Sequence, residues 1–298
     1  MRAYQATTTD VFRNLAAEEW LLDAPPPQTP LLFLWQSSSA VVIGKNQNPW
    51  LECDTAALAG EGVTLARRIS GGGAVYHDGG NLNYALLQPR AEYDRGQVFD
   101  RLADALRGLG IPAERMGRSS LGCGGRKFSG TAFCFRGGRA LHHGTVLVNA
   151  DLDRLRRVLQ VPARRIRTRA IASEPAPVMN LQEVRPSLTV ETLAAALAGA
   201  WGQGVVDRSE PWQTDARYGE LCRRHTSAAW RWGRTPPFEA DHDSPHGGDI
   251  LRLTVRVEQG VIVSFRWRGV PPAEPAVAAY PERWRGMSYP QFLENPGE

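Results

Sequence analysis

Residues 67–83 read RRISGGGAVYHDGGNLN, which sets three consecutive glycines between an arginine pair and a segment typical of β-structure. Strand interiors disfavour glycine, because it has no side chain to pack and loses the most backbone entropy on folding. Glycine is favoured where another group must approach the backbone, since no Cβ stands in the way. The stretch therefore predicts a turn between strands at which something meets the backbone closely.

Lysine is rare in this chain. Of the 35 basic residues only Lys45 and Lys127 are lysine, and both fall in segments expected to be turns. An ammonium is a compact point charge, whereas a guanidinium is a planar fork. We expect Lys45 to be a solvated turn residue and Lys127 to have a chemical role that needs a compact cation.

The composition is that of a globular protein, with 42% hydrophobic residues in a chain of 298. This length fits one large domain and a small one. The first thirty residues lack the features of a signal peptide, and no later segment is long and apolar enough to span a bilayer. The four cysteines have neither the density of a disulfide scaffold nor the spacing of a zinc site. We therefore expect a cytoplasmic protein that makes no membrane contact.

The net charge of +4 is a weak signal for nucleic-acid binding. The arginine-rich run RRIRTR at 164–169 has no aromatic residues interleaved with it, unlike single-strand-binding surfaces. We expect a solvated face or a contact for an acidic protein partner, and no nucleic acid.

Hydrophobic periodicity predicts alternating helices and strands. The helix at 97–109 has apolar residues at helical spacing, and the one at 9–23 begins with a Thr/Asp cap. Further helices are expected near 151–159, 190–202 and 215–229.

Short apolar runs bounded by turn residues predict the strands. LLFLWQ (31–36) and AVVIG (40–44) look like paired strands, and 63–70 and 74–87 add strands on either side of the glycines. Two hairpins are expected, one from 127–135 with 140–149 and one from 250–257 with 261–267. Between them, WRWGRTPPFEADHDSPHGGD shifts to Pro, Gly and Asp and predicts a domain boundary near residue 236.

His142 and His143 are adjacent on a predicted strand. Neighbouring side chains of a strand point to opposite faces, so the two imidazoles cannot ligate one metal together. We expect one of them to lie in the core or to face a partner. The metal ligands stay unassigned.

Five stretches in order resemble the signature segments of lipoate-protein ligases in the biotin/lipoate ligase family. They are NLAAEEWLL, VVIGKNQNPWLECD, RRISGGGAVYHDGGNLN, GRKFSGTAF and HHGTVLVNADL. The resemblance covers residues 9–235 of the chain. It implies an α+β fold with a mixed β-sheet flanked by helices. It also implies a catalytic domain over 1–236 and a shortened C-terminal accessory domain over 237–298.

The resemblance implies that the protein activates lipoate or octanoate with ATP and Mg²⁺. The products are an acyl adenylate and pyrophosphate, and the acyl group then passes to one lysine of a lipoyl domain or H-protein-like acceptor. A carboxylate and a phosphate repel each other, so such a site needs positioning and fixed positive charge. Lys127 is the implied catalytic residue, contacting both the carboxylate and the α-phosphate. We expect a monomer.

The other site residues follow from the same resemblance. Those expected to contact ATP are Arg68, Gly73, Ala74, Val75, Tyr76 and Lys127. Those expected to bind the acid are Ile69, Ser70, Gly71, Gly72, Gly73, His77, Asn83, Gly144 and Thr145.

The chain departs from the family pattern in three places. Ser119 and Ser120 stand where an Asn-Asp pair is usual, which bears on metal handling. The loop at 172–181, ASEPAPVMNL, lacks the arginine usual before its end. The tail of the chain is shorter than the usual accessory domain, which bears on lid motion and on the choice of acceptor.

Two alternatives stay open. One is an ATP-independent octanoyl or lipoyl transferase that carries the acyl group as a cysteine thioester, because Cys123 and Cys134 flank Lys127 and a nearby ammonium lowers a thiol pKa. The other is a non-catalytic acyl-binding adaptor, suggested by Ser119 and Ser120.

Overall fold

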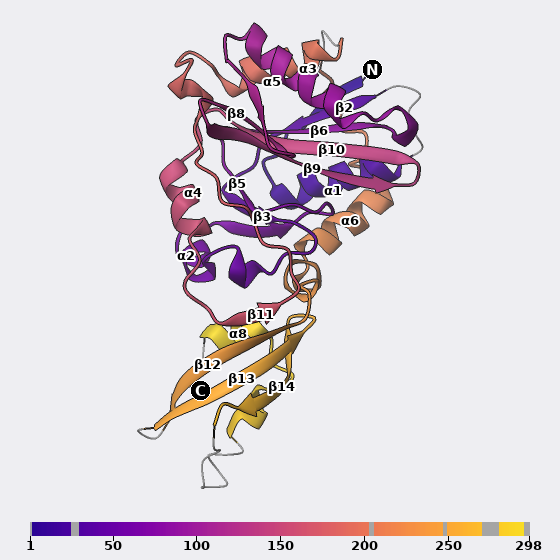
Figure 1. Cartoon of the computed structure of the whole chain (residues 1–298). Helices are drawn as coiled ribbons and strands as arrows, with labels where there is room; N and C mark the ends of the chain where they lie inside the picture. Colours follow the sequence, from indigo (N-terminus) through magenta and orange to yellow (C-terminus); the bar gives the residue numbers. More distant parts are fainter. Residues whose placement is uncertain (1, 25–29, 203–205, 247–248, 270–279, 295–298) are drawn as a thin grey trace.

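The computed structural model describes residues 2–24, 30–202, 206–246, 249–269 and 280–294. Figure 1 shows a larger body above a smaller unit that contains the last strands of the chain. The strands are β1 (Arg2–Gln5), β2 (Leu31–Trp35), β3 (Ala40–Ile43), β4 (Thr64–Arg67), β5 (Val75–His77), β6 (Asn81–Pro89), β7 (Glu114–Met116), β8 (Ser120–Cys123), β9 (Arg126–Arg136), β10 (Arg139–Leu147), β11 (Ile166–Thr168), β12 (Phe238–His246), β13 (Asp249–Glu258) and β14 (Val261–Trp267). The α-helices are α1 (Val11–Asp23), α2 (Thr55–Gly60), α3 (Arg95–Gly108), α4 (Leu152–Leu159), α5 (Val190–Ala200), α6 (Ala216–Thr226) and α8 (Tyr289–Glu294). Short helices of other types are η1 (Pro49–Leu51), η2 (Arg90–Glu92), η3 (Leu181–Glu183), η4 (Ala229–Gly233) and η5 (Tyr280–Trp284).

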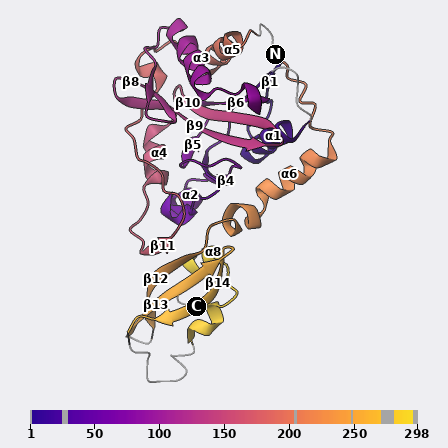
Figure 2. The same ribbon diagram turned by 45° about the vertical axis from the view of Figure 1, so that its right-hand side comes forward.

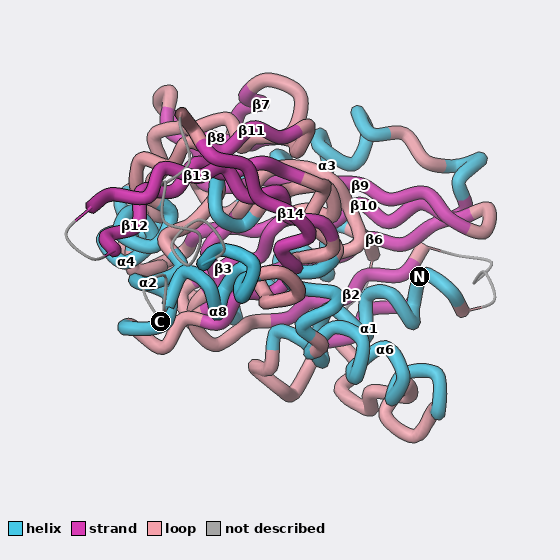
Figure 3. Tube along the Cα trace, turned by 90° about the horizontal axis from the view of Figure 1, so that it is seen from below, coloured by secondary structure: helices cyan, strands magenta, loops and turns pink. Residues whose placement is uncertain are grey.

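A mixed seven-stranded sheet forms the centre of the larger body, with the order β1-β2-β6-β10-β9-β8-β7. β1 runs parallel to β2, and the other neighbours are antiparallel. Figure 3 shows β2, β6, β10 and β9 side by side in that order. The expected hairpin of β9 and β10 is confirmed, and so is the α+β fold with a mixed sheet flanked by helices.

Helices cover both faces of this sheet because its central strands are apolar on both sides. Leu32 and Leu34 of β2 pack with α3 and α5, whereas Leu31 and Phe33, of opposite parity, pack with α1 and α6. Alternate residues of a strand point to opposite faces, so one strand supplies both cores. All five helices expected from the sequence are present, with ends shifted by a few residues.

The prediction that 31–36 and 40–44 pair with each other is wrong. β2 lies in the seven-stranded sheet, and β3 is the middle strand of a separate sheet with the order β4-β3-β5. The segment QSSS between them carries the chain from one sheet to the other. Because both strands are buried, each needs partners on two sides, and a simple hairpin of the two would leave edges unpaired.

The smaller unit is a four-stranded sheet in the order β11-β12-β13-β14 (Figure 2). The β13–β14 hairpin is confirmed. The segment whose composition predicts the domain boundary contains β12, a strand that the sequence analysis did not predict. Its strand alternates in a simple way: Phe238 and Ala240 face the core of the smaller unit, while charged residues face outward.

The smaller unit takes two parts from the larger body. β11 comes from the segment before residue 236 and pairs antiparallel with β12. Trp50 of η1 is fully buried and its ring lies 5.3 Å from Trp232, 5.2 Å from Phe238 and 4.8 Å from Tyr289. The domain boundary near residue 236 stays a prediction. The hydrophobic core of the smaller unit nevertheless includes Trp50, which precedes that boundary in the sequence.

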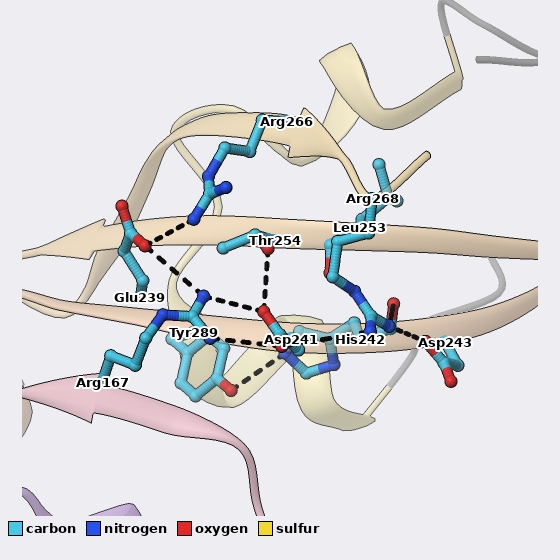
Figure 4. Close-up of polar contacts among 10 residues, drawn as sticks. All are labelled: Arg167, Glu239, Asp241, His242, Asp243, Leu253, Thr254, Arg266, Arg268 and Tyr289. Carbon is cyan, nitrogen blue, oxygen red and sulfur yellow. Dashed lines mark hydrogen bonds and ion pairs between the residues drawn. The ribbon is translucent and has the colours of Figure 1, made fainter. Parts of the chain in front are cut away.

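The outer face of the smaller sheet, which we call the charged face, carries Arg167, Glu239, Asp241, Asp243, Thr254, Arg266 and Arg268 (Figure 4). Arg167 lies 2.8 Å from Asp241 and 3.4 Å from Glu239, and Arg266 lies 2.9 Å from the same glutamate. Hydrogen bonds from Arg167 and Thr254 hold the pKa of Asp241 at about 2. These groups pair with one another across four strands, from β11 to β14.

Within the described ranges, the helices are too short or too polar to cross a membrane.

Candidate active site

A cavity of about 720 Å³, here called cavity 1, opens beside the glycine turn of residues 71–73. Its inner end is lined by buried residues, including Glu18, Trp35 and His77. Its outer end is lined by Ser119, which is exposed, and by Ile171, which is 54% exposed. The cavity therefore runs from the core of the larger body to the surface.

The floor of cavity 1 is a row of residues placed by strand register. Trp35 of β2 lies opposite Asn83 of β6, which lies opposite Thr145 of β10. Thr145 lies opposite Gly130 of β9, which lies opposite Ser120 of β8. All five line the cavity, because directly opposed residues share a face of the sheet. Neighbouring strands lie about 4.8 Å apart, so Trp35 and Gly130 are separated by about 14 Å.

Lys127 lies in β9, so the prediction of a turn at this residue is wrong. Its N–H donates to the Pro177 carbonyl at 2.8 Å, and its carbonyl accepts from Met179 at 3.0 Å. The ammonium lies over Gly130, where a Cβ would be 2.9 Å from Nζ. Burial lowers the pKa of Lys127, and the positive charge of Arg68 lowers it further.

The structure explains two of the three glycines, Gly72 and Gly73. Gly72 has φ of +85°, a conformation that L side chains rarely adopt. A Cβ at Gly73 would lie 2.9 Å from Ser173 Oγ. The Gly72 carbonyl also approaches the backbone of Gly44, where a Cβ would come within 2.3 Å of it. At Gly71 a Cβ would meet nothing within 4 Å. The backbone is therefore approached closely by the protein's own segments.

Arg68 fixes the direction of the peptides in this turn. Its guanidinium donates to the Gly71 carbonyl at 2.6 Å and to the Gly73 carbonyl at 2.7 Å. In a trans peptide the carbonyl and the following N–H point in opposite directions, so the N–H groups of Gly72 and Ala74 point away from Arg68. Burial lowers the pKa of Arg68 to about 10, which leaves it charged at neutral pH.

The segment 171–179, here called the strap, crosses the site. Its Ser173 hydroxyl accepts from the Ala74 N–H at 2.8 Å and from Gln47 at 3.1 Å, and it donates to the Glu52 carboxylate. Ile171 donates to the Asn46 carbonyl at 3.1 Å. Burial raises the pKa of Glu52. The Ser173 oxygen of the strap thus accepts the hydrogen bond of the Ala74 N–H, which a bound anion would need.

A second cavity of about 420 Å³, cavity 2, lies between α4 and the strap. Leu155 and Leu159 of α4 give it an apolar wall. Lys127, Thr145 and Glu174 are among the residues that line both cavities. Lys127 therefore stands where a molecule in one cavity would meet a molecule in the other.

A buried polar chain supports the inner end of cavity 1. Glu18 accepts from Trp35 Nε1 at 2.9 Å and lies 2.6 Å from His143 Nδ1, and His143 Nε2 lies 2.6 Å from Ser70 Oγ. The order resembles a hydrolase triad. The Ser70 oxygen, however, accepts from Arg68 at 3.1 Å, and Ser70 does not line either cavity. We interpret the chain as a support for Arg68 and the glycine turn.

The structure brings most of the predicted site residues together. Those that line cavity 1 are Arg68, Gly72, Gly73, Ala74, Val75, His77, Asn83, Lys127, Gly144 and Thr145. Tyr76 lines cavity 2. Ile69 and Ser70 are buried behind the wall, and Gly71 is exposed beside it. Their assigned roles toward ATP and the acid stay predictions.

Sequence reasoning missed several residues of the site. Ser173, Glu52 and Gln47 join the strap to the body, and Glu18 and Trp35 close the inner end. Glu18 and Trp35 looked like ordinary members of a helix stripe and an apolar strand, so no local signal identified them. Of the adjacent histidines, His143 faces cavity 1, whereas His142 is packed on the opposite face against Phe99 and Tyr93.

The cysteines do not have the environment that a thioester carrier needs. Burial raises the pKa of the Cys134 thiol and raises that of Cys53 to about 12. Cys123 lies in β8, and neither it nor Cys134 lines either cavity. A nucleophilic cysteine requires access and a stabilised thiolate.

Metal ligands are sparse in the described part of the chain, which has no group of three His, Cys, Asp or Glu side chains able to hold an ion. Magnesium bound with a nucleotide commonly uses one or two carboxylates together with phosphate oxygens. Glu174 lines both cavities, and Ser119 and Ser120 line cavity 1. The oxygens present are compatible with Mg²⁺ that arrives with a phosphate ligand.

Comparisons with known proteins agree on the family. A curated lipoate-protein ligase A from Psychrobacter cryohalolentis is 35% identical over 274 residues, covering 88% of this chain and 81% of that protein. The crystal structure of P. falciparum LipL1 in complex with lipoate matches with a TM-score of 0.71 and 26% identity, covering 89% and 84% of the two chains. A bi-partite lipoate protein ligase from Thermoplasma acidophilum, described with its E2 lipoyl domain, has the same fold with a TM-score of 0.63 at 24% identity, covering 78% of this chain and 96% of that one.

The family model for the lipoyl protein ligase A/B catalytic domain matches residues 10–202. This range contains the glycine turn, Lys127 and the strap. It also covers more than half of the chain, and the chain therefore belongs to the lipoyl protein ligase A/B catalytic-domain family.

Proposed function

We propose that the protein activates lipoate or octanoate with ATP and transfers the acyl group from the adenylate to a lysine of a lipoyl domain or H-protein-like acceptor. The observation that carries this proposal is the position of Lys127, a half-buried cation lining both cavities. In the proposed arrangement the acid lies in cavity 1 and the adenosine of ATP lies in cavity 2. Their carboxylate and α-phosphate then meet at the Lys127 ammonium.

The chemistry of adenylation fits this arrangement. The carboxylate oxygen attacks the α-phosphorus, forming a P–O bond while the bond to pyrophosphate breaks. Two anions must approach for this attack, so a fixed positive charge between them lowers the barrier. Arg68 contributes indirectly: it turns the Gly71 and Gly73 carbonyls inward, so that the next N–H groups, those of Gly72 and Ala74, point outward.

The strap must move for the phosphates to use the Ala74 N–H, because Ser173 accepts from it. The Ser173 oxygen occupies the position at the Ala74 N–H that a phosphate oxygen would take. When Mg²⁺ is bound it neutralises phosphate charge, and Glu174, Ser119 and Ser120 are the residues that would hold it.

Acid-dependent exchange of labelled pyrophosphate into ATP tests adenylation without an acceptor. We expect exchange with lipoate or octanoate and none without an acid. Absence of exchange with both acids would contradict the proposal and favour a non-catalytic acyl-binding adaptor.

The cysteine-dependent transferase makes the opposite prediction. Here the double variant Cys123→Ser, Cys134→Ser should still load lipoate onto a lipoyl domain, and omission of ATP should stop loading. Mass spectrometry of the acceptor measures both. Loading from an acylated carrier without ATP, lost in the double variant, would establish the transferase instead.

A further inference from the structure

The second half of strand β9 is an open sheet edge. β8 pairs with β9 only as far as Gly130, and beyond it the Thr131 N–H donates to the Ser119 carbonyl at 2.8 Å. On its other side β9 pairs with β10 as far as their shared turn. Within the described part of the chain, residues 132–136 therefore have a strand neighbour on one side only.

The free main-chain groups of this edge belong to Phe133 and Phe135. In an antiparallel strand the N–H and C=O of one residue point to the same side, and successive residues alternate between the two sides. Because the Thr131 N–H points away from β10, the N–H and C=O groups of Phe133 and Phe135 do so too. These groups have no hydrogen-bond partner among the described residues, so they can pair with a further strand.

The edge lacks the features that usually keep edge strands from pairing. Residues 132–135 read AFCF and include neither proline nor a charge, and their register with β10 is regular. Phe135 is 45% exposed. Because proteins commonly protect open edges with charges, proline or a bulge, an unprotected apolar edge indicates a partner strand.

The position of the edge beside cavity 1 identifies the partner. Thr131 and Ala132 line that cavity, so a strand added to the edge would end at the mouth of the cavity. A residue of this strand opposite Ala132 would lie two residues along β9 and one strand across from Gly130, about 8 Å away. A lysine at that point could reach the acyl group that the proposed function places at Lys127.

The charges around the edge indicate an acidic partner surface. Arg90, Arg95 and Arg118 are exposed and form no ion pair among the described residues. The Arg90 guanidinium lies 3.8 Å from the centre of the Phe135 ring, and that of Arg95 lies 5.7 Å from the centre of the Phe133 ring. Arg118 lines the outer end of cavity 1. Asp and Glu side chains of a partner would complement these three cations.

We infer that the acceptor protein docks by adding one of its edge strands to residues 132–136 of β9, with acidic side chains against Arg90, Arg95 and Arg118. The inference rests on the proposed function, because the acceptor is the substrate of its second step. In that step the lysine nitrogen forms a bond to the acyl carbon, the bond from this carbon to the AMP oxygen breaks, and the amine releases a proton. Main-chain hydrogen bonds give such a complex its affinity, and the flanking charges orient the strand.

Hydrogen exchange tests the docking site directly. The probe is a lipoyl domain whose target lysine is replaced by arginine, so that it binds the full-length protein without being loaded. We expect protection of the Phe133 and Phe135 amides when this domain is bound, and no change in the β13–β14 hairpin. Unchanged exchange over residues 131–136 in the complex would overturn the inference.

Two substitutions at one position isolate the main-chain contact. Phe135→Pro removes an N–H that makes no bond within the chain, and edge strands tolerate proline. Phe135→Val is the matched control, because it also loses the ring but keeps the N–H. We expect Phe135→Pro to raise the Kd of the same lipoyl domain about three- to tenfold above that of Phe135→Val. Acid-dependent pyrophosphate exchange should be unaltered in both variants. Equal Kd values would overturn the inference.

Charge reversal tests the acidic partner. Arg95→Glu should weaken binding of the lipoyl domain about tenfold at low salt and less at high salt. Arg101→Glu, a control later in α3 at another exposed arginine, should have little effect, and equal losses in the two variants would contradict the acidic partner. A dimer of this chain that Phe135→Pro dissociates would assign the edge to a second copy and overturn the inference. Failure of pyrophosphate exchange in the wild type would contradict the proposed function, while hydrogen exchange would still decide the docking site.

Discussion

The charged face of the smaller sheet and the inner end of cavity 1 are both rich in polar side chains, but the two regions differ in whether these side chains are hydrogen-bonded within the chain. On the charged face, Arg167, Asp241 and Thr254 satisfy one another across three strands. At the inner end, His77 and Asn83 are buried but leave ring and amide nitrogens unpaired among the described residues. A polar group that is hydrogen-bonded within the chain gains little from a further partner. A buried group left unpaired gains a hydrogen bond when a ligand binds, and this bond adds to the free energy of binding.

Lys127 offers the largest effect and the sharpest test of this comparison. We expect Lys127→Ala to reduce acid-dependent pyrophosphate exchange by at least about 100-fold, because a preorganised charge at the reacting anions is lost. Lys127→Arg should also fail, since a planar fork does not replace a compact charge over Gly130. Lys45→Ala is the matched control, as Lys45 lines neither cavity. Equal loss in both alanine variants would show that the position of the charge is irrelevant.

Glu19 lies between the two extremes, since it is fully buried and fully paired. Burial alone would raise its pKa, but hydrogen bonds from His225 and Arg224 outweigh burial and hold the pKa at about 2, against 4.5 when unperturbed. A lowered acid pKa stabilises the folded state above the unfolded pKa, and this contribution disappears as the pH falls from about 4.5 to about 2. We expect a loss of about 3 kcal/mol in the free energy of unfolding over that window.

Urea unfolding at a series of pH values measures this loss. Glu19→Gln should be less stable than the wild type at pH 7 and should have a flatter pH dependence below pH 4.5. An unaltered slope in that variant would assign the acid sensitivity to other groups.

Substitutions at Gly72 and Gly71 compare a glycine that is held at positive φ with a neighbour that has open space for a Cβ. Gly72→Val should lower the free energy of unfolding by about 2 kcal/mol, because a β-branched residue is strained at positive φ. A Cβ there would also lie 3.0 Å from Arg68 Nη2. Gly71→Ala has open space at its Cβ and should keep wild-type stability. Thermal unfolding of both variants decides the point, and equal melting temperatures would contradict it.

The charged face should give the smallest effect. Asp241→Asn removes the carboxylate that pairs with Arg167, and we expect less than about 1 kcal/mol in stability because the Arg167 side chain is 50% exposed and ion pairs with a solvated partner contribute little. The loss should shrink further at high salt. A loss as large as that of Glu19→Gln would show that the charged face is not an ordinary solvated surface.

The sequence predicted the elements of the larger body well, because its helices are capped and periodic and its hairpin has a glycine turn. It could not assign β2 and β3 to separate sheets, since both are short apolar runs that look alike. It also missed β12, whose alternating acids resemble a polar loop until the core side of Phe238 and Ala240 is seen. Strand partners are set by burial on both sides, which is a property of the whole fold.

The candidate site was predictable where its residues form a motif. The glycine turn and Lys127 are both recognisable from local sequence. The strap contacts were not, because Ser173 meets Gln47 and Glu52 across more than 120 positions of the chain. Glu18 and Trp35 can likewise be recognised as site residues only when the strand register places Trp35 opposite Asn83.

The sharing of Trp50 and β11 with the smaller unit also constrains inheritance. If a gene were split near residue 236, the N-terminal product would expose the Trp50 indole and leave β11 without its partner strand. The C-terminal product would lack Trp50, which fills its core. In the present chain such a split requires compensating changes in both products at once, and substitutions near Trp50 should be inherited together with substitutions around Phe238 and Tyr289.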